Sequence, residues 1–172
     1  GRNNWRRYLF SLQNPGENIP EEDQNTVDFA VTSVSYEENN ARQPVPYVIP
    51  PGVNRQMAAV STGQNIQLNE QALSLQVCNL KDGDIRAVYK EVGVDMRQFG
   101  SLRMFIHAES RVGSAPLKDG DIRAVIRIGS DFTNNYYEYQ MPLTITLPGT
   151  NTDEGVWPAA NRLDLVLNDL VN

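Results

Sequence analysis

Leu-Lys-Asp-Gly-Asp-Ile-Arg-Ala-Val, residues 80–88, occurs a second time without a change at residues 117–125. Each copy places an Asp-Gly pair, which favours a tight turn, before a run of alternating apolar and polar residues. Alternation with a period of two residues is typical of a β-strand buried on one face. The repeat therefore predicts two similar turns that each lead into a strand. A solenoid needs three or more such units, so two copies do not indicate one.

Alternation also dominates the rest of the chain, and about eight short strands are expected. Glycine, proline and asparagine turn signals separate the apolar runs, as at Asn134-Asn135. One run, residues 27–36, is apolar on both faces, which predicts a central strand. The apolar runs lie at residues 5–13, 27–36, 72–80, 92–99, 102–109, 122–128, 136–147 and 163–167.

Many short strands without long helices predict an all-β fold. We expect an antiparallel β-sandwich of jelly-roll (galactose-binding-like) type. A chain of 172 residues fits one domain, residues 1–172, and a domain of that size buries about 70% of its unfolded surface without disulfides. Residues 163–171 fit both a strand and one face of a helix, and we expect a short strand followed by a helical turn.

The composition limits the classes of partner. A formal net charge of −6 disfavours nucleic acid and anionic membrane surfaces, which require clustered Lys and Arg. Cys78 is the only cysteine, so no intrachain disulfide is possible, and we expect it to be a small buried apolar residue. No apolar run approaches eighteen residues, and the chain starts at Gly1 without a signal peptide. We expect a soluble segment of a longer protein.

The sequence contains no recognisable catalytic or cofactor-binding motif. There is neither a P-loop nor a Gly-x-Gly-x-x-Gly motif. His107 is the only histidine, so any histidine-based triad would have to use its ring. Alternation places it on the face of Arg103 and Phe105, and a single strand histidine favours a structural role. We predict that the protein is not an enzyme and assign no catalytic, cofactor-binding or metal-binding residue.

The two Asp-Gly-Asp turns allow a calcium hypothesis. Asp82, Asp84, Asp119 and Asp121 supply carboxylate oxygens, which are the ligands that calcium prefers. Neither copy continues into the spacing of an EF-hand loop. Two turns that lead into strands are the simpler interpretation of the same residues.

Aromatic residues near the C-terminal half allow a carbohydrate hypothesis, because sugars stack on flat rings. Tyr136 and Trp157 are the candidates, with calcium at the Asp-Gly-Asp turns as a possible aid. Tyr137 and Tyr139 share a face with Met141, Leu143 and Ile145, and this pattern predicts core positions. A carbohydrate-binding jelly-roll module is therefore the alternative function.

A proline-rich segment, residues 43–53, is the candidate contact surface. Prolines prevent a regular hydrogen-bonded element there. A loop this long either has a function or packs as a strap across the domain. We call residues 43–53 the strap. Tyr47, Val48 and Ile49 give it apolar side chains that can pack on a partner or close its own domain.

Several longer strings together span nearly the whole chain. They are Asn4-Trp5-Arg6-Arg7-Tyr8, Tyr36-Glu37-Glu38-Asn39-Asn40-Ala41-Arg42, Tyr47-Val48-Ile49-Pro50-Pro51-Gly52-Val53, Gln67-Leu68-Asn69-Glu70-Gln71-Ala72-Leu73-Ser74-Leu75, Asp95-Met96-Arg97, Leu102-Arg103-Met104-Phe105-Ile106-His107-Ala108-Glu109, Asp131-Phe132 and Asn134-Asn135-Tyr136-Tyr137-Glu138-Tyr139. These strings resemble the SprA/Sov family.

Members of that family are giant outer-membrane proteins of Bacteroidota that form the translocon of the type IX secretion system and support gliding motility. The resemblance implies a non-catalytic soluble domain of such a translocon, on the periplasmic or extracellular side of the outer membrane. It would serve as a scaffold or a protein-contact surface. The implied partners are the remainder of the parent barrel, partner secretion subunits or secreted cargo. The chain lacks the lipid-facing apolar band of a membrane strand, so we expect no direct insertion.

Overall fold

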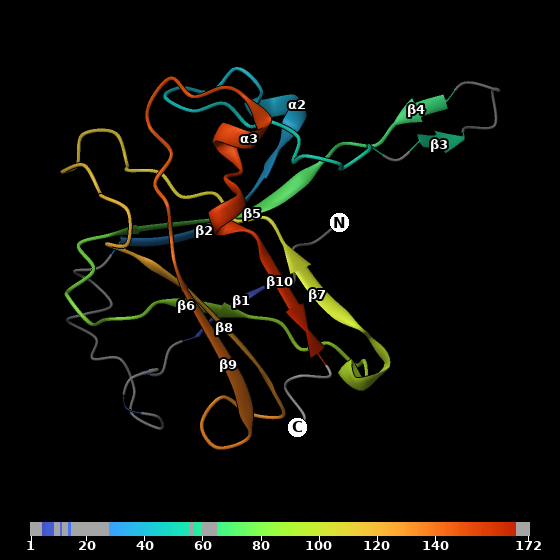
Figure 1. Ribbon diagram of the computed structural model, residues 1–172, viewed down its shortest axis with the longest axis vertical. Helices are drawn as coiled ribbons and strands as arrows, with labels where there is room; N and C mark the ends of the chain where they lie inside the picture. The colour runs from blue at the N-terminus through green and yellow to red at the C-terminus, as the bar shows by residue number, and fades with distance from the viewer. Residues whose placement is uncertain are drawn as a thin grey trace. The chain divides into compact units, whose positions relative to one another are not determined.

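The structure, a computed structural model, describes residues 5–8, 11, 14, 28–55, 57–59 and 65–167 (Figure 1). Strands dominate them, and the helical elements are single turns, so the all-β prediction is confirmed. The elements in chain order are β1 (Arg6–Tyr8), β2 (Asp28–Ser35), α2 (Tyr36–Asn39), β3 (Met57–Ala59), β4 (Asn65–Gln67), β5 (Gln71–Cys78), β6 (Ala87–Tyr89), η1 (Met96–Gln98), β7 (Ser101–Met104), β8 (Arg123–Gly129), β9 (Tyr136–Pro142), α3 (Asp153–Val156), η2 (Ala159–Asn161) and β10 (Leu163–Val166).

The described strands form two-stranded sheets. The pairs are β1 with β6, β2 with β5, β3 with β4, β7 with β10 and β8 with β9. Pairing is antiparallel in β1–β6, β3–β4 and β7–β10, as the sequence predicted. Strand β2, expected to be central, pairs with β5 alone within the described part of the chain. The jelly-roll order of strands stays a prediction.

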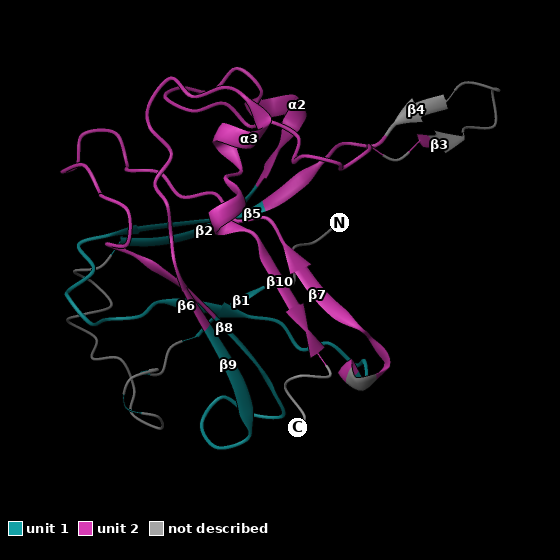
Figure 2. Cartoon of the chain, in the orientation of Figure 1, with its two compact units in different colours: residues 1–33, 73–95, 126–139 teal, residues 34–72, 96–125, 140–172 magenta. Residues whose placement is uncertain are grey.

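The chain divides into two compact units (Figure 2). Unit 1 contains residues 1–33, 73–95 and 126–139, and unit 2 contains residues 34–72, 96–125 and 140–172. Each unit is therefore assembled from three separate stretches of sequence. That residues 1–172 behave as a single domain stays a prediction.

Aromatic rings hold unit 1 together. Tyr8 of β1 contacts Phe132 edge to face, with 5.5 Å between ring centroids. Tyr89 of β6 completes the group at 6.2 Å from Tyr8 and 5.8 Å from Phe132. Phe29 of β2 is buried, and the Arg7 guanidinium lies 5.6 Å from its ring centroid. Edge-to-face pairs add about 0.5–1.5 kcal/mol each beyond the burial of apolar area.

Unit 2 has a core that joins the strap to the C-terminal third of the chain. Val45 and Tyr47 from the strap pack with Val156 and Trp157. Asn161, also in unit 2, is fully buried. Its side chain accepts a hydrogen bond from the Thr144 N–H and donates one to the Thr144 carbonyl, both at 2.8 Å. A buried side-chain amide that satisfies both the N–H and the C=O group of one residue fixes the position of its own loop relative to that residue.

Both copies of the nine-residue repeat fold as predicted, each as a turn that leads into a strand. The Asp84 N–H donates to the Lys81 carbonyl at 3.0 Å in the first copy. The Asp121 N–H donates to the Lys118 carbonyl at 3.1 Å in the second. Each turn places glycine at positive φ, 81° at Gly83 and 87° at Gly120, a conformation that costs other residues strain. The strands that follow are β6 and β8.

Some expectations about strands were wrong. The strand predicted over residues 102–109 ends at Met104, because the chain then bonds to another segment: the Thr146 N–H donates to the Ala108 carbonyl at 2.8 Å. Tyr137 and Tyr139 are exposed, although Met141 further along the same face is buried. Strand β9 passes from unit 1 into unit 2 after residue 139. Residues on one of its faces therefore belong to different units and differ in burial.

Other expectations were met in part. Strands β2, β5, β8 and β10 lie where the sequence predicted them. The strand expected over residues 92–99 was wrong, since that stretch contains only the short η1, and the strand expected over residues 136–147 ends at Pro142. Much of the predicted first strand and the helical turn after β10 lie outside the described residues. The sequence analysis missed α3, although Thr152 caps it by accepting a 3.2 Å hydrogen bond from the Gly155 N–H, which is a usual signal for a helix start.

We predict that Leu163→Ala lowers the free energy of unfolding by about 3 kcal/mol, because it leaves a cavity in a packed site. Leu163 is only 1% exposed. Val166→Ala on the same strand, where Val166 is 50% exposed, should cost less than about 0.5 kcal/mol. Urea unfolding followed by near-UV circular dichroism measures both. Equal losses for the two variants would contradict the packing described for β10.

Candidate functional site

The strap packs against the core of its own unit. Val45 is fully buried and Tyr47 is 8% exposed. Val48 is half-buried, and its carbonyl accepts a 2.7 Å hydrogen bond from the Trp157 indole N–H. The sequence allowed either a partner or the unit's own core to cover these side chains, and their apolar groups cover the core.

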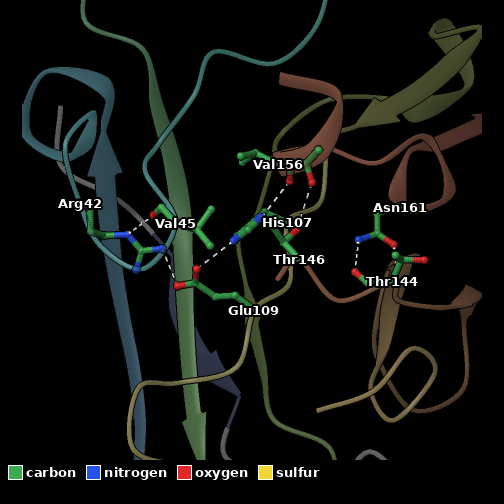
Figure 3. A network of polar contacts seen from close by, with 9 residues as sticks. Arg42, Val45, His107, Glu109, Thr144, Thr146, Val156 and Asn161 are labelled. Carbon is green, nitrogen blue, oxygen red and sulfur yellow. Dashed lines mark hydrogen bonds and ion pairs between the residues drawn. The ribbon is translucent and has the colours of Figure 1, made fainter. Parts of the chain in front are cut away.

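Arg42 fixes the start of the strap (Figure 3). Its Nε donates to the Val45 carbonyl at 3.0 Å, and its Nη2 donates to Glu109 Oε1 at 2.5 Å. The guanidinium thus ties a loop to a carboxylate 67 positions away in the sequence. A charged donor in this geometry makes stronger hydrogen bonds than a neutral one.

His107 lies on the other side of Glu109 in the same network (Figure 3). Its Nε2 is 3.3 Å from Glu109 Oε2, and its Nδ1 is 2.9 Å from the Val156 carbonyl oxygen. Thr146 Oγ1 lies 3.3 Å from Nδ1. Because a carbonyl oxygen only accepts, Nδ1 carries the proton. The ring also packs edge to face on Trp157 at 5.9 Å, and the expected structural role accounts for these contacts.

Two opposing effects set the protonation of Glu109. Burial raises its pKa, but hydrogen bonds and positive charge from His107 and Arg42 lower it more, so the pKa lies below its ordinary value. The carboxylate is therefore ionised at neutral pH and balances the Arg42 charge. Glu109 is two residues from His107 in the sequence, but no local pattern connects Arg42 to them.

A cleft of about 440 Å³ opens beside the strap. The strap forms one wall, and the 149–151 loop forms the other through a 2.9 Å hydrogen bond from the Gly149 N–H to the Pro44 carbonyl. Burial, followed by the charge of Glu70, raises the pKa of Tyr47 to about 12, so its phenol is neutral. Ten residues line the cleft: Tyr36, Asn40, Ala41, Gln43, Pro44, Pro46, Tyr47, Val48, Gly149 and Asn151.

Three of the four aspartates of the calcium hypothesis make contacts within the protein. Among the residues that the structure describes, no group of three or more His, Cys, Asp or Glu side chains could hold a metal ion. Asp119 Oδ1 accepts a 2.7 Å hydrogen bond from the Ile145 N–H, and Asp121 Oδ2 accepts one at 2.8 Å from the Lys118 N–H. Asp84 lies 3.7 Å from Arg86 in the first copy. These contacts give three of the four a role in the turns.

The aromatic residues of the carbohydrate hypothesis are covered by protein. Trp157 is 8% exposed, and its ring contacts Tyr47, Phe105 and His107. The Arg127 guanidinium lies 4.3 Å from the centroid of the Tyr136 ring. Trp157 therefore offers no open face on which a sugar stacks, and Arg127 occupies one face of the half-buried Tyr136 ring.

Asp131 organises the loop between β8 and β9. Its carboxylate accepts backbone hydrogen bonds from residues 133–135 at 2.6–3.1 Å and a side-chain hydrogen bond from Asn135. These bonds, led by the one from Asn134, hold its pKa far below the ordinary range. The predicted turn at Asn134-Asn135 is confirmed, and its cause is this carboxylate. Cys78 of unit 1 is half-buried, less buried than expected.

Comparison with known protein families gives one result that spans the chain. Residues 1–172 match the SprA_N family, described as motility related/secretion protein. The chain belongs to this family. The resemblance to SprA/Sov proteins is thereby confirmed, and SprA_N is a family of motility and secretion proteins and not one of enzymes. No curated protein matches this SprA_N chain. In the described part of the chain, no helix has both the length and the apolar character needed to cross a membrane.

We predict that Glu109→Gln destabilises the folded chain by about 1–2 kcal/mol at pH 7, since it removes a charge-assisted contact whose Arg42 partner is partly solvent-screened. The folded pKa of Glu109 is lowered, so its stabilisation is present above its ordinary pKa of 4.5 and is lost as pH falls through the folded value. The difference in unfolding free energy between the unaltered chain and Glu109→Gln should therefore disappear in acid. Urea unfolding at several pH values measures it.

Glu38→Gln is the control for that titration, because Glu38 is exposed. Its unfolding free energy should follow that of the unaltered chain at every pH. A gap for Glu109→Gln that stays constant from neutral pH into acid would show that its charge does not stabilise the strap.

The repeat supplies a matched pair for a second prediction. Asp119→Ala should lower the unfolding free energy by about 1–2 kcal/mol, because the partly buried Ile145 N–H loses its acceptor. Asp82→Ala, at the same position of the first copy, should change it by less than about 0.5 kcal/mol, because no described residue donates a hydrogen bond to that carboxylate. Thermal melts compare the two variants, and calcium added to the unaltered chain should leave its melt unmoved. Equal effects of the two substitutions would contradict the difference between the copies.

Proposed function

We propose that this SprA_N chain is a non-catalytic soluble domain of the type IX secretion translocon in the outer membrane. It supports protein export and gliding motility as a scaffold or a protein-contact surface. Its partners are the remainder of the parent translocon, partner secretion subunits or cargo proteins. Membership of a motility and secretion family supports the general role, and the β7–β10 ladder supports a role in contact.

No further strand of the described part of the chain lines either edge of the β7–β10 ladder. In the described residues β7 and β10 bond only to each other, with Leu163 opposite Met104 and Val166 opposite Ser101. Figure 1 shows the two strands side by side. A two-stranded ribbon is marginally stable by itself, and its free N–H and C=O groups can pair with a further strand.

Both faces of this ladder expose apolar side chains. Met104, on the face of Leu163, is 40% exposed, and Val166, on the opposite face, is 50% exposed. Phe99, two residues before β7, is 49% exposed. Apolar side chains on both faces of a ribbon with open edges are typical of a surface that another protein covers. The edges of the ladder, together with its exposed apolar side chains, are the observation that supports the proposed contact role.

The test is Val166→Asp in the parent protein. A carboxylate buried at an interface without a partner costs more than the 1.4 kcal/mol that corresponds to a tenfold change in affinity. We therefore predict that the affinity of the contact falls about tenfold or more. Export of secreted proteins and colony spreading are the measurements, with the amount of parent protein in the outer membrane followed by immunoblot.

Val112→Asp is the matched control. Val112 is 75% exposed and belongs to a turn closed by the Ser114 N–H and the Arg111 carbonyl. Both variants should change the free energy of unfolding of the 172-residue chain by less than about 0.5 kcal/mol. If Val166→Asp supports export and spreading as well as Val112→Asp does, the ladder is not the contact surface.

A further inference from the structure

The cleft beside the strap has unused hydrogen-bonding groups. Asn40, Gln43 and Asn151 line it and are exposed. None of their side-chain amides bonds to a residue that the structure describes. A carboxamide donates and accepts at once, as a peptide backbone does. The three amides can therefore bind both N–H and C=O groups of an extended chain.

Charge and shape narrow the class of ligand. No acidic or basic side chain lines the cleft within the described residues, so a charged ligand would lose hydration without gaining a partner. Pro44 and Pro46 are half-exposed and add apolar contact. Prolines lack an N–H, so the strap cannot pair there as a strand, and recognition depends on side chains. A volume of about 440 Å³ lies in the range of ligand pockets.

The aromatic residues of the cleft argue against a sugar. Tyr47 is only 8% exposed. The Arg55 guanidinium lies 5.4 Å from the Tyr36 ring centroid, and the same ring packs against the core. Neither ring is free for the stacking that sugar recognition uses.

The walls of the cleft are fixed before any ligand arrives. Tyr36 and Asn40 are linked through a 2.9 Å backbone hydrogen bond, and the Tyr47 N–H donates to the Asn39 carbonyl at the same distance. Beneath the strap, Arg42 and Trp157 hold the carbonyls of Val45 and Val48. A preformed site loses little conformational entropy on binding.

We propose that this cleft binds an extended, uncharged polypeptide segment through the carboxamides of Asn40, Gln43 and Asn151. The inference rests on the proposed function and names the chemistry of one contact that the domain makes. It places recognition at the carboxamides beside the strap, while the side chain of Val45 serves the core.

The test uses the 172-residue chain and an array of capped octapeptides made only of Gly, Ala, Ser, Thr, Asn and Pro. The same array with two Asp or two Lys residues per peptide, and a glycan array, are measured in parallel. The triple variant N40A/Q43A/N151A should bind uncharged peptides at least tenfold more weakly than the unaltered chain. The control triple N54A/Q71A/Q98A replaces exposed carboxamides elsewhere and should bind normally.

Amide chemical shifts locate the bound peptide, and expected changes map to residues 40–48 and 149–151. Equal melts of both triple variants exclude a folding defect. Binding of glycans without peptides, preference for charged peptides, binding by none of the probes or shifts outside the cleft would each overturn the inference. Export by the Val166→Asp variant tests the proposed function separately, so failure of the cleft leaves that result intact.

Discussion

Unit 2 depends on the placement of the Trp157 side chain. Its ring packs against Tyr47, Phe105 and His107, and its N–H donates to the Val48 carbonyl. A large ring that also has a polar atom must satisfy both in one orientation. The strap must therefore follow a path that brings the Val48 carbonyl to the indole. That path also shapes the cleft beside the strap.

The polar network around Glu109 extends the same constraint. Arg42 and His107 approach opposite oxygens of the carboxylate, and His107 continues to the Val156 carbonyl beside Trp157. Apolar packing and charged hydrogen bonds thus fix the strap from two sides. This arrangement explains why prolines, which remove backbone donors, are tolerated in the strap: side chains from elsewhere bind its carbonyls.

Local patterns in the sequence predicted what depends on neighbouring residues. The repeated nonapeptide predicted both turns and their strands, and alternation located most of β2, β5 and β8. It could not show that the face bearing Tyr139 and Met141 crosses from one unit to the other. It also could not connect Arg42 with Glu109 or Asn161 with Thr144, because these pairs form only when distant segments pack. The proline and apolar residues of the strap could be read from the sequence. The grouping of the Asn40, Gln43 and Asn151 amides around its cleft could not.

The order in which the chain becomes available limits how it can fold. The hydrogen bond between Trp157 and Val48 spans 109 positions, and unit 1 needs Phe132 beside Tyr8. Contacts of such separation make folding slow, because a long loop must close before they form. A ribosome or export channel that releases the chain from its N-terminus holds back both cores until nearly the whole sequence has emerged. Until then the strap is an open, proline-stiffened segment accessible to chaperones.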